Sequence, residues 1–166
     1  MMGNKLTETY IVERVKSFLI NKENGNWHEE KVKQSKLHEH GVDIKLIGGK
    51  SNSEYFFIEC KGKSYARSEK SRNSIDSECW LNALGQLITR MTASRIIKSG
   101  KTKGLPNRGY RYGLGLYYKS AQVALRRIPK EIARTLNLYI FSVDDEGVIT
   151  VPTPAEILHP VILCLH

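Results

Sequence analysis

Three ionisable residues stand at the ends of two apolar segments in the first half of the chain. Asp43 lies near the start of the alternating segment VDIKLI, and Glu59 and Lys61 close the apolar segment YFFIECK. Side chains alternate between the faces of a β-strand, so Glu59 and Lys61 are predicted to share one face while Cys60 points into the core on the other. Burying unpaired charges is costly, and a strand that ends in a carboxylate and an amine therefore indicates a site.

These residue types could support metal-assisted chemistry at a phosphate group. If the two segments pair as an antiparallel hairpin, Asp43 approaches Glu59, and two carboxylates forced together repel each other unless a cation lies between them. Carboxylate oxygens are hard ligands of the kind that Mg²⁺ binds, usually with several water molecules retained. Lys61 could then orient or help to deprotonate a metal-bound water, or stabilise charge that develops on a phosphate.

The charge distribution favours a polyanionic partner. The net charge is +9, and residues 61–134 hold 17 Lys and Arg against four Asp and Glu. Clustered Lys and Arg side chains gain affinity for nucleic acid by releasing phosphate counterions, although a run of charge is also typical of a merely solvated face. Phosphate contacts position DNA without reading its sequence. The residues expected to make them are Lys63, Arg67, Lys70, Arg72, Arg90, Arg95, Lys98, Lys101, Lys103, Arg108, Arg111, Arg126, Arg127 and Lys130.

Hydrophobic periodicity predicts the elements that must position these residues. An amphipathic helix is expected over 7–20, with Thr7 as its N-cap, followed by a weak strand within 27–34 and a hairpin of strands 42–47 and 55–61. The second half is expected to hold an exposed basic loop over 64–74, a long helix over 74–98, a strand over 112–118, a largely helical segment over 121–136 with a break or a new start at Pro129, and a final hairpin over 138–151. This order predicts an α/β fold in which one central mixed β-sheet is flanked by helices on both faces.

A single domain is expected for the 166 residues, with a core over about 7–150 and an apolar tail, 151–166, that the pattern does not place. The start MMGNKLTETY lacks the apolar region of a signal peptide, and the apolar runs are too short to span a membrane. Three cysteines without a CxxC spacing argue against a disulfide framework or a cysteine zinc site and favour a reducing cytoplasm. His38 and His40 flank Gly41 in a polar segment, which is more typical of a surface than of a metal site.

The motif Gly41-Val42-Asp43, a strand and a turn, and then Glu59-Cys60-Lys61 resembles that of the PD-(D/E)XK nuclease superfamily, near its Holliday-junction resolvases and Mrr-type restriction enzymes. Val42 stands where the family often has a proline. The resemblance extends over about residues 7–150, because YGLGLYY, ALRRIPKEIARTL and LYIFSVDDEG look similar to the late strand, helix and strand of the family. It implies a restriction-endonuclease-like fold and a Mg²⁺- or Mn²⁺-dependent endonuclease of the restriction, repair or junction-resolving type, which hydrolyses DNA and leaves a 5′-phosphate.

The resemblance also implies a role for each residue of the motif. Asp43, Glu59 and the backbone carbonyl of Cys60 would hold the metal ion. Lys61 would position or activate the attacking water.

Two further positions of the family are matched on helices. A glutamate of the first helix would support the metal site, and Glu8 lies on the inward apolar stripe of that helix whereas Glu13 falls off it. Glu8 is therefore preferred, although a glutamate in a first turn is also favoured by the helix dipole alone. Gln86 would join the site from the long helix, and Arg90 would reach a phosphate from the same flank. The stripe predicted to be buried beside them consists of Trp80, Leu84, Leu87, Ile88 and Met91.

Cutting both strands of a duplex with one site per chain implies a homodimer with two-fold symmetry. Two alternatives stay open. A nucleic-acid-binding module could keep the fold without the chemistry, and the retained Asp43, Glu59 and Lys61 argue against it. A small enzyme acting on another substrate, with an incidental basic surface, would bind DNA weakly even at low salt.

Overall fold

The helices and strands follow one another along the chain in the predicted order. The computed structural model describes residues 6–21, 24, 27–29, 42–48, 54–63, 65, 68–99 and 110–151. The helices of this part of the chain are α1 (Glu8–Ile20), α2 (Glu69–Ser99), α3 (Tyr118–Arg127) and α4 (Lys130–Leu136). Its strands are β1 (His28–Glu29), β2 (Ile44–Gly48), β3 (Glu54–Lys61), β4 (Tyr110–Tyr117), β5 (Leu138–Val143) and β6 (Ile149–Thr150).

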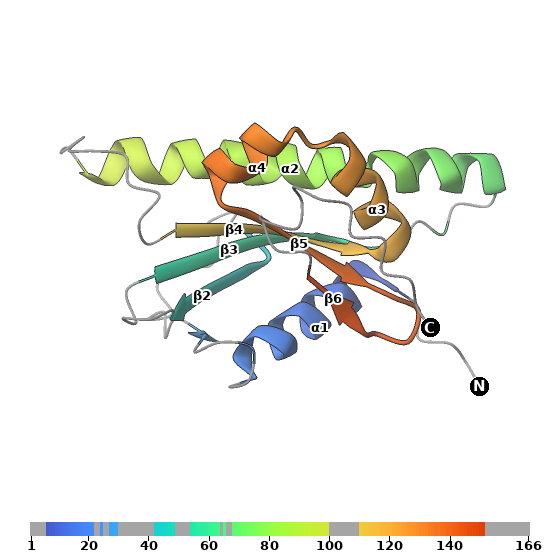
Figure 1. The fold of residues 1–166 in the computed structure, drawn as a ribbon, viewed down its shortest axis with the longest axis horizontal. Coiled ribbons are helices and arrows are strands. Elements are labelled where there is room, and N and C mark those ends of the chain that lie inside the picture. Colours follow the sequence, from blue (N-terminus) through green and yellow to red (C-terminus); the bar gives the residue numbers. More distant parts are fainter. Residues whose placement is uncertain are drawn as a thin grey trace.

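The strands form one mixed sheet in which neighbours in sequence are also neighbours in space. β2 is antiparallel to β1 and to β3, the strands β3, β4 and β5 run parallel, and β6 returns antiparallel to β5. One face of the sheet is covered by α1 and the other by α2, α3 and α4 (Figure 1). The predicted α/β architecture is therefore confirmed, and the carboxyl ends of the three parallel strands meet at the same edge, on the right of Figure 1.

The helix α1 packs on the sheet through one apolar stripe. Thr7 Oγ1 accepts a hydrogen bond of 3.2 Å from the backbone N–H of Tyr10, which caps the first turn as predicted. Ile11, Val15 and Leu19 are buried and recur at the spacing of one helix face. The core beneath α1 also contains Leu6, Trp27, Ile44, Leu46, Phe56, Ile58, Cys60, Tyr117, Phe141 and Val143.

The helix α2 begins earlier than predicted. A loop is expected over 64–74, but the helix starts at Glu69, so the prediction is wrong from that residue onward. Ser68 explains the difference, because its Oγ accepts a hydrogen bond of 3.1 Å from the backbone N–H of Ser71 in the manner of an N-cap.

The buried stripe of α2 also differs from the prediction. Ile88 is 40 % exposed, whereas Ala83 is fully buried. Ala83 belongs to the same core cluster as Ala121 and Ala124 of α3, and small side chains at this contact let the two helices approach each other closely. The rest of the predicted stripe is buried at Trp80 and Leu87, half-buried at Leu84, and outside the described side chains at Met91.

The last third of the described chain follows the prediction. Pro129 separates α3 from α4 and occupies the N-cap of α4, where its missing N–H breaks no helical hydrogen bond. The hairpin of β5 and β6 is closed by Asp144, whose Oδ1 accepts hydrogen bonds from the N–H groups of Glu146 at 2.9 Å and Val148 at 2.7 Å. The rest of the predicted apolar tail, beyond Val151, lies outside the described residues.

Candidate active site

The hairpin of β2 and β3 brings the two predicted acidic residues together. Ile44 lies opposite Ile58 in the antiparallel register, so the next position places Asp43 opposite Glu59. The Asp43 carboxylate lies at the end of β3, where its Oδ2 accepts a hydrogen bond of 2.7 Å from the backbone N–H of Cys60. Asp43 and Glu59 are therefore neighbours at one edge of the sheet, while their metal-binding role stays a prediction.

Lys61 links two carboxylates at the same place. Its Nζ lies 3.1 Å from Oε2 of Glu8 and 3.5 Å from Oε1 of Glu59. Only 1 % of the Glu59 side chain is exposed, compared with 20 % for Lys61 and 50 % for Glu8. The ammonium group therefore lies between one buried and one half-exposed carboxylate.

The start of α1 is held against the end of β3 by the backbone. The N–H of Lys63 donates a hydrogen bond of 2.8 Å to the carbonyl of Leu6. A Cβ atom at Gly62 would overlap the backbone nitrogen of Glu8, so this approach requires glycine. The same packing carries Glu8 to the site and leaves Glu13 exposed on another side of α1, which agrees with the predicted preference for Glu8.

The surrounding carboxylates keep Lys61 protonated. Burial by itself lowers the pKa of this amine, but the hydrogen bond and charge of Glu8 and the charges of Glu59 and Asp43 outweigh burial and raise the pKa above its ordinary value. An amine that stays protonated cannot take a proton from water. The geometry therefore favours a role in orienting water and offsetting negative charge over a role as a base.

Cys60 faces the core between these charged residues. Its side chain is fully buried beneath α1. Burial, followed by the negative charges of Asp43, Glu59 and Glu8, raises the pKa of the thiol well above its ordinary value. The sulfur therefore stays protonated and acts as part of the core rather than as a nucleophile.

The donor atoms fit a hard divalent cation by charge and by type. Three carboxylates, of Glu8, Asp43 and Glu59, and the ammonium of Lys61 give a formal charge of −2, and carboxylate oxygens are the ligands that Mg²⁺ prefers. As arranged, the carboxylates are engaged with Lys61 and with a backbone N–H. Within the described part of the chain, no group of three or more His, Cys, Asp or Glu side chains is placed to hold an ion. Binding one would require a carboxylate to exchange its present partner.

Gln86 does not lie with these residues. The helix α2 begins beyond the carboxyl ends of the strands and runs back over the sheet (Figure 1), and the first of its described side chains to be buried is that of Asp76. Gln86 is exposed and lies ten residues beyond Asp76, which is about 15 Å along a helix axis. Its position does not support the predicted role, and the side chain of Arg90 lies outside the described side chains.

A second polar cluster, not predicted from the sequence, lies beside the first. Asp76 is only 8 % exposed, and the hydroxyl group of the fully buried Tyr117 lies close to it. Burial, together with the Asp76 charge, raises the pKa of Tyr117 well above its ordinary value. Next to this pair, Cys79 Sγ and Ser120 Oγ are 2.7 Å apart. We call Asp76, Cys79, Tyr117 and Ser120 the inner cluster, and Glu8, Asp43, Glu59 and Lys61 the outer cluster.

One member of the inner cluster leaves a signal in the sequence. Asp76 precedes Trp80, Ala83 and Leu87 by four, seven and eleven residues, which places an acid on the buried stripe of α2. A carboxylate on such a stripe needs a polar partner. No comparable signal identifies Tyr117, because an aromatic residue at the end of a strand is ordinary.

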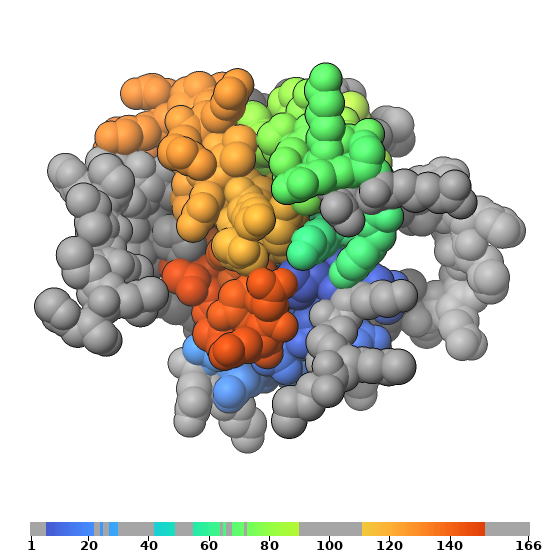
Figure 2. Space-filling view, turned by 90° about the vertical axis from the view of Figure 1, so that its right-hand side faces the viewer, coloured from blue at the N-terminus to red at the C-terminus, as the bar shows by residue number. Residues whose placement is uncertain are grey.

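Both clusters lie near the carboxyl ends of β3 and β4. This end of the molecule is formed by the first turns of α1 and α2, the start of α3 and the turn between β5 and β6, which come together in Figure 2. The space beyond the carboxyl ends of parallel strands is a common place for ligands in α/β proteins.

Several basic residues lie around this end. Lys63 follows the outer cluster directly, and Lys70 is exposed in the first turn of α2. Lys119, which was not predicted, is exposed in the first turn of α3, with its Nζ 6.0 Å from the centre of the Tyr118 ring. Arg126 and Arg127 lie further from the clusters, in the last turn of α3 and about 13 Å along the helix axis from its start, and Lys130 begins α4. Apart from Arg111, the other residues predicted to contact phosphates lie outside the described residues or side chains, namely Arg67, Arg72, Arg90, Arg95, Lys98, Lys101, Lys103 and Arg108.

Arg111 stands apart from the site. It lies near the start of β4, where its guanidinium carbon is 5.4 Å from the ring centre of Trp27 and 5.7 Å from that of Tyr139. Its Nη1 donates a hydrogen bond of 3.2 Å to the Tyr139 hydroxyl. These cation–π contacts tie aromatic side chains together at the opposite end of β4 from the clusters. The position of Arg111 therefore argues against the predicted phosphate contact at the site.

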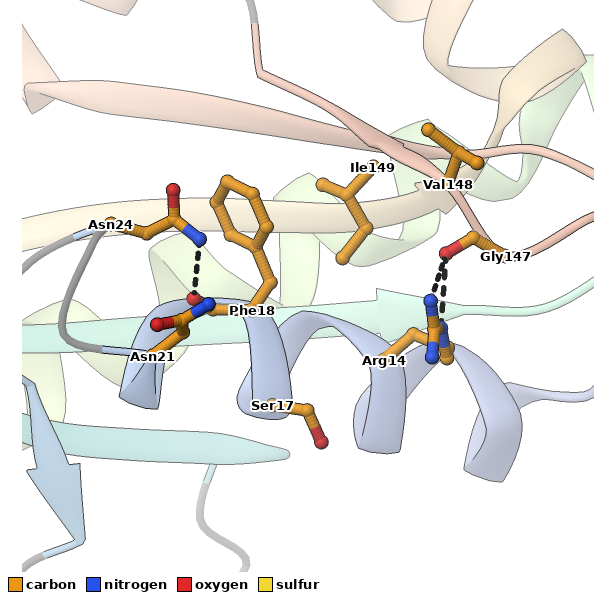
Figure 3. Close-up of a pocket in the computed structure, with 8 residues that line it drawn as sticks. All are labelled: Arg14, Ser17, Phe18, Asn21, Asn24, Gly147, Val148 and Ile149. Atoms are coloured by element: carbon orange, nitrogen blue, oxygen red, sulfur yellow. Dashed lines mark hydrogen bonds between the residues drawn. The ribbon is translucent and has the colours of Figure 1, made fainter.

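A separate depression lies between α1 and the turn that joins β5 to β6. It has a volume of about 420 Å³ and is lined by Arg14, Ser17, Phe18, Asn21, Asn24, Gly147, Val148 and Ile149 (Figure 3). Arg14 reaches from α1 to the carbonyl of Gly147, to which its Nε donates at 2.9 Å and its Nη2 at 2.7 Å. No residue of either cluster lines this depression. The guanidinium group of Arg14 holds the turn against α1.

Within the described residues, no helix combines the length and the apolar character needed to cross a membrane.

Comparisons with known proteins assign no family to the chain. A scan against protein-family models gives no match, and neither do searches of curated proteins and of solved structures.

Proposed function

We propose that this chain is a metal-dependent DNA endonuclease of the PD-(D/E)XK type, with a restriction-endonuclease-like fold. The observation that carries the proposal is the outer cluster itself. Asp43 Oδ2 lies 2.7 Å from the Cys60 nitrogen, and the Lys61 ammonium lies between Glu8 and Glu59. Desolvating several charges together is costly for a fold, and perturbed ionisable groups gathered at one end of a sheet are typical of a catalytic site.

Mg²⁺ or Mn²⁺ is the proposed cofactor. Asp43 and Glu59 would hold the ion together with the backbone carbonyl of Cys60, and Glu8 would support it from α1. A divalent ion of this kind supplies a water of lowered pKa and polarises a phosphoryl oxygen. The nearly complete burial of Glu59 keeps its carboxylate in one orientation, whereas the half-exposed Glu8 has freedom to adjust.

Lys61 would orient the attacking water and offset the charge that develops on the phosphate. Its raised pKa keeps the ammonium charged, and in the metal-free protein its carboxylate partners lie 3.1 Å and 3.5 Å away. A charged donor held at the site lowers the barrier when negative charge develops on the phosphate.

DNA is the proposed substrate because basic residues surround the site. Lys63, Lys70 and Lys119 lie at the same end of the molecule and would contact phosphates that flank the scissile one. Cutting both strands would require two copies of the chain related by a two-fold axis, so a homodimer is part of the proposal.

The test is a cleavage assay of the purified chain on linear duplex, branched-junction and single-stranded DNA, with Mg²⁺ or Mn²⁺. We expect products with 5′-phosphate ends that form only with a divalent ion and disappear in Glu59→Ala and Lys61→Ala. Glu13→Ala is a matched control for Glu8→Ala, because Glu13 is exposed elsewhere on the same helix. Cleavage that survives in the Glu59 and Lys61 variants would reject the proposal.

The same assay separates the alternatives. Salt-sensitive DNA binding without cleavage in either metal would identify a non-catalytic nucleic-acid-binding module. Weak binding even at low salt would point instead to an enzyme that acts on another substrate.

A further inference from the structure

The outer cluster already contains one cation. The Lys61 ammonium lies 3.1 Å from Glu8 and 3.5 Å from Glu59, the carboxylates that would face a metal ion in the proposed function. Two positive groups within about 4 Å of each other repel strongly in the partly buried environment of a protein. The ammonium and a divalent ion therefore compete for the same oxygens.

We infer that Lys61 is the internal counter-ion of the outer cluster, and that a divalent cation binds by displacing the Lys61 ammonium from Glu8 and Glu59. This inference builds on the metal site of the proposed function and adds the event that must accompany metal binding. Without the ammonium, Glu59 would lie in the core with less compensation for its charge, because only 1 % of its side chain reaches solvent. Lys61 thus stabilises the metal-free protein and weakens its affinity for the metal.

Exposure decides which groups can move in this exchange. The Lys61 side chain is 20 % exposed and that of Glu8 is 50 % exposed, so both can turn toward solvent or toward a substrate phosphate. Glu59 is enclosed by the core, and Asp43 is tied to the Cys60 N–H at 2.7 Å. We therefore assign the movement to Lys61 and Glu8, while Asp43 and Glu59 keep their places.

The experiment is a calorimetric titration of the full chain with Mg²⁺, and separately with Mn²⁺, in the absence of DNA. Lys61→Met keeps the length of the side chain without its charge, and Lys61→Gln keeps a hydrogen-bonding group if the methionine variant folds poorly. Both variants should bind the ions about tenfold more tightly than the wild type, which corresponds to about 1.4 kcal/mol. Thermal unfolding should show a larger stabilisation by Mn²⁺ in these variants than in the wild type.

Lys63→Met is the matched control, because Lys63 carries the same charge two residues further along the chain. Its metal affinity should stay within about twofold of the wild type, since screening weakens interactions between charges that are not in contact. Equal or weaker binding by Lys61→Met and Lys61→Gln would overturn the inference, as would an equal gain in Lys63→Met.

The cleavage assay distinguishes this inference from the proposed function. Tighter metal binding by the Lys61 variants of a chain that cuts no DNA would uphold the exchange and reject the nuclease. Metal-dependent cleavage by the wild type without tighter binding in the variants would reject the exchange alone. No binding of either ion by any of these proteins would reject both.

Discussion

Two polar clusters meet at the same end of the sheet, and they differ in charge and in access to solvent. The outer cluster has four formally charged side chains, and its exposure rises from 1 % at Glu59 to 50 % at Glu8. The inner cluster has one formally charged residue, Asp76, and all four of its members are buried. The outer cluster can exchange partners with solvent and ligands, whereas the inner cluster can exchange them only if the helices separate. Burial of polar groups alone therefore does not distinguish the two clusters, whereas the graded exposure of the outer cluster does.

The pKa directions separate the two clusters in the same way. In the outer cluster, carboxylates raise the pKa of Lys61, so the charged form is the favoured one. In the inner cluster, burial raises the pKa of Cys79 and of Tyr117, so the neutral forms are favoured. The charged form of Lys61 is thus favoured in the outer cluster, whereas the neutral forms of Cys79 and Tyr117 are favoured where α2 and α3 meet the sheet.

The largest expected difference between the clusters is in catalysis. Glu59→Gln preserves the shape of a buried side chain but removes its charge, and we expect the cleavage rate to fall about 10³-fold, or roughly 4 kcal/mol in the barrier. Asp76→Asn makes the same change in the inner cluster and should lower the rate of the folded protein less than about fivefold. Single-turnover cleavage by the two variants measures both effects, and similar losses would mean that the clusters form one site.

The next effect concerns the backbone contact that carries Glu8 to Lys61. Gly62→Ala would force a Cβ atom into the backbone of Glu8, and we expect a loss of about 1–3 kcal/mol in the free energy of unfolding, together with lower activity. Gly85→Ala is the control, because a Cβ at Gly85 in α2 would meet no atom within 4 Å apart from its chain neighbours and the backbone of its own helix. That variant should be more stable by about 0.5–1 kcal/mol, since alanine favours a helix interior. Urea unfolding measures both, and a stable Gly62→Ala would show that α1 can shift without cost.

The pairing of Asp43 with the end of β3 was predictable from the sequence because the geometry of a hairpin is local. Alternation along β3 determines which side chains share a face, and pairing with β2 brings Asp43 to the end of that strand. The apolar stripe of α1 likewise separates Glu8 from Glu13, because helical periodicity records which side packs on the sheet. Each of these inferences needs only one element or one hairpin, whereas the meeting of Glu8 with Lys61 joins two elements and was expected only from the family resemblance.

The failures depend on how elements sit against one another. Helical periodicity places Gln86 beside the apolar stripe of α2, but it does not show which turn of this 31-residue helix lies over the end of β3. That position follows from where α2 begins, and Ser68 caps this start by accepting a hydrogen bond from the Ser71 N–H. The inner cluster forms only where three separate elements meet. Asp76, an acidic residue on a buried stripe, is the one member that the sequence pattern could have indicated.

Alkaline pH offers a smaller test of the inner cluster. The folded protein holds the Tyr117 proton more tightly than the unfolded chain, whose tyrosines titrate near about pH 10. Above that pH the unfolded chain loses the proton first, so this residue lowers the stability by up to about 1.4 kcal/mol per pH unit as the pH rises. Lys61 contributes in the same direction, because its pKa is also raised in the folded protein.

Replacing the tyrosine isolates its share of this slope. In Tyr117→Phe, the free energy of unfolding should fall less steeply between about pH 10 and about pH 11.5 than in the wild type. Tyr118→Phe, at the half-buried tyrosine one residue further on, is the control. Urea unfolding at several pH values gives the slopes, and parallel curves for Tyr117→Phe and the wild type would contradict the pKa direction.

The smallest expected effect is at the contact between Cys79 and Ser120. Their side chains are 2.7 Å apart and buried, and Ser120→Ala removes one partner while the thiol that remains is only a weak hydrogen-bonding group. We expect a loss of about 0.5–1.5 kcal/mol in the free energy of unfolding and no change in metal affinity or cleavage. Urea unfolding and the metal titration check the two halves of this statement. No Ser120 atom is expected to reach the metal. A loss of metal affinity in Ser120→Ala would therefore show that the inner cluster is coupled to the outer cluster, and it would contradict the distinction between the two.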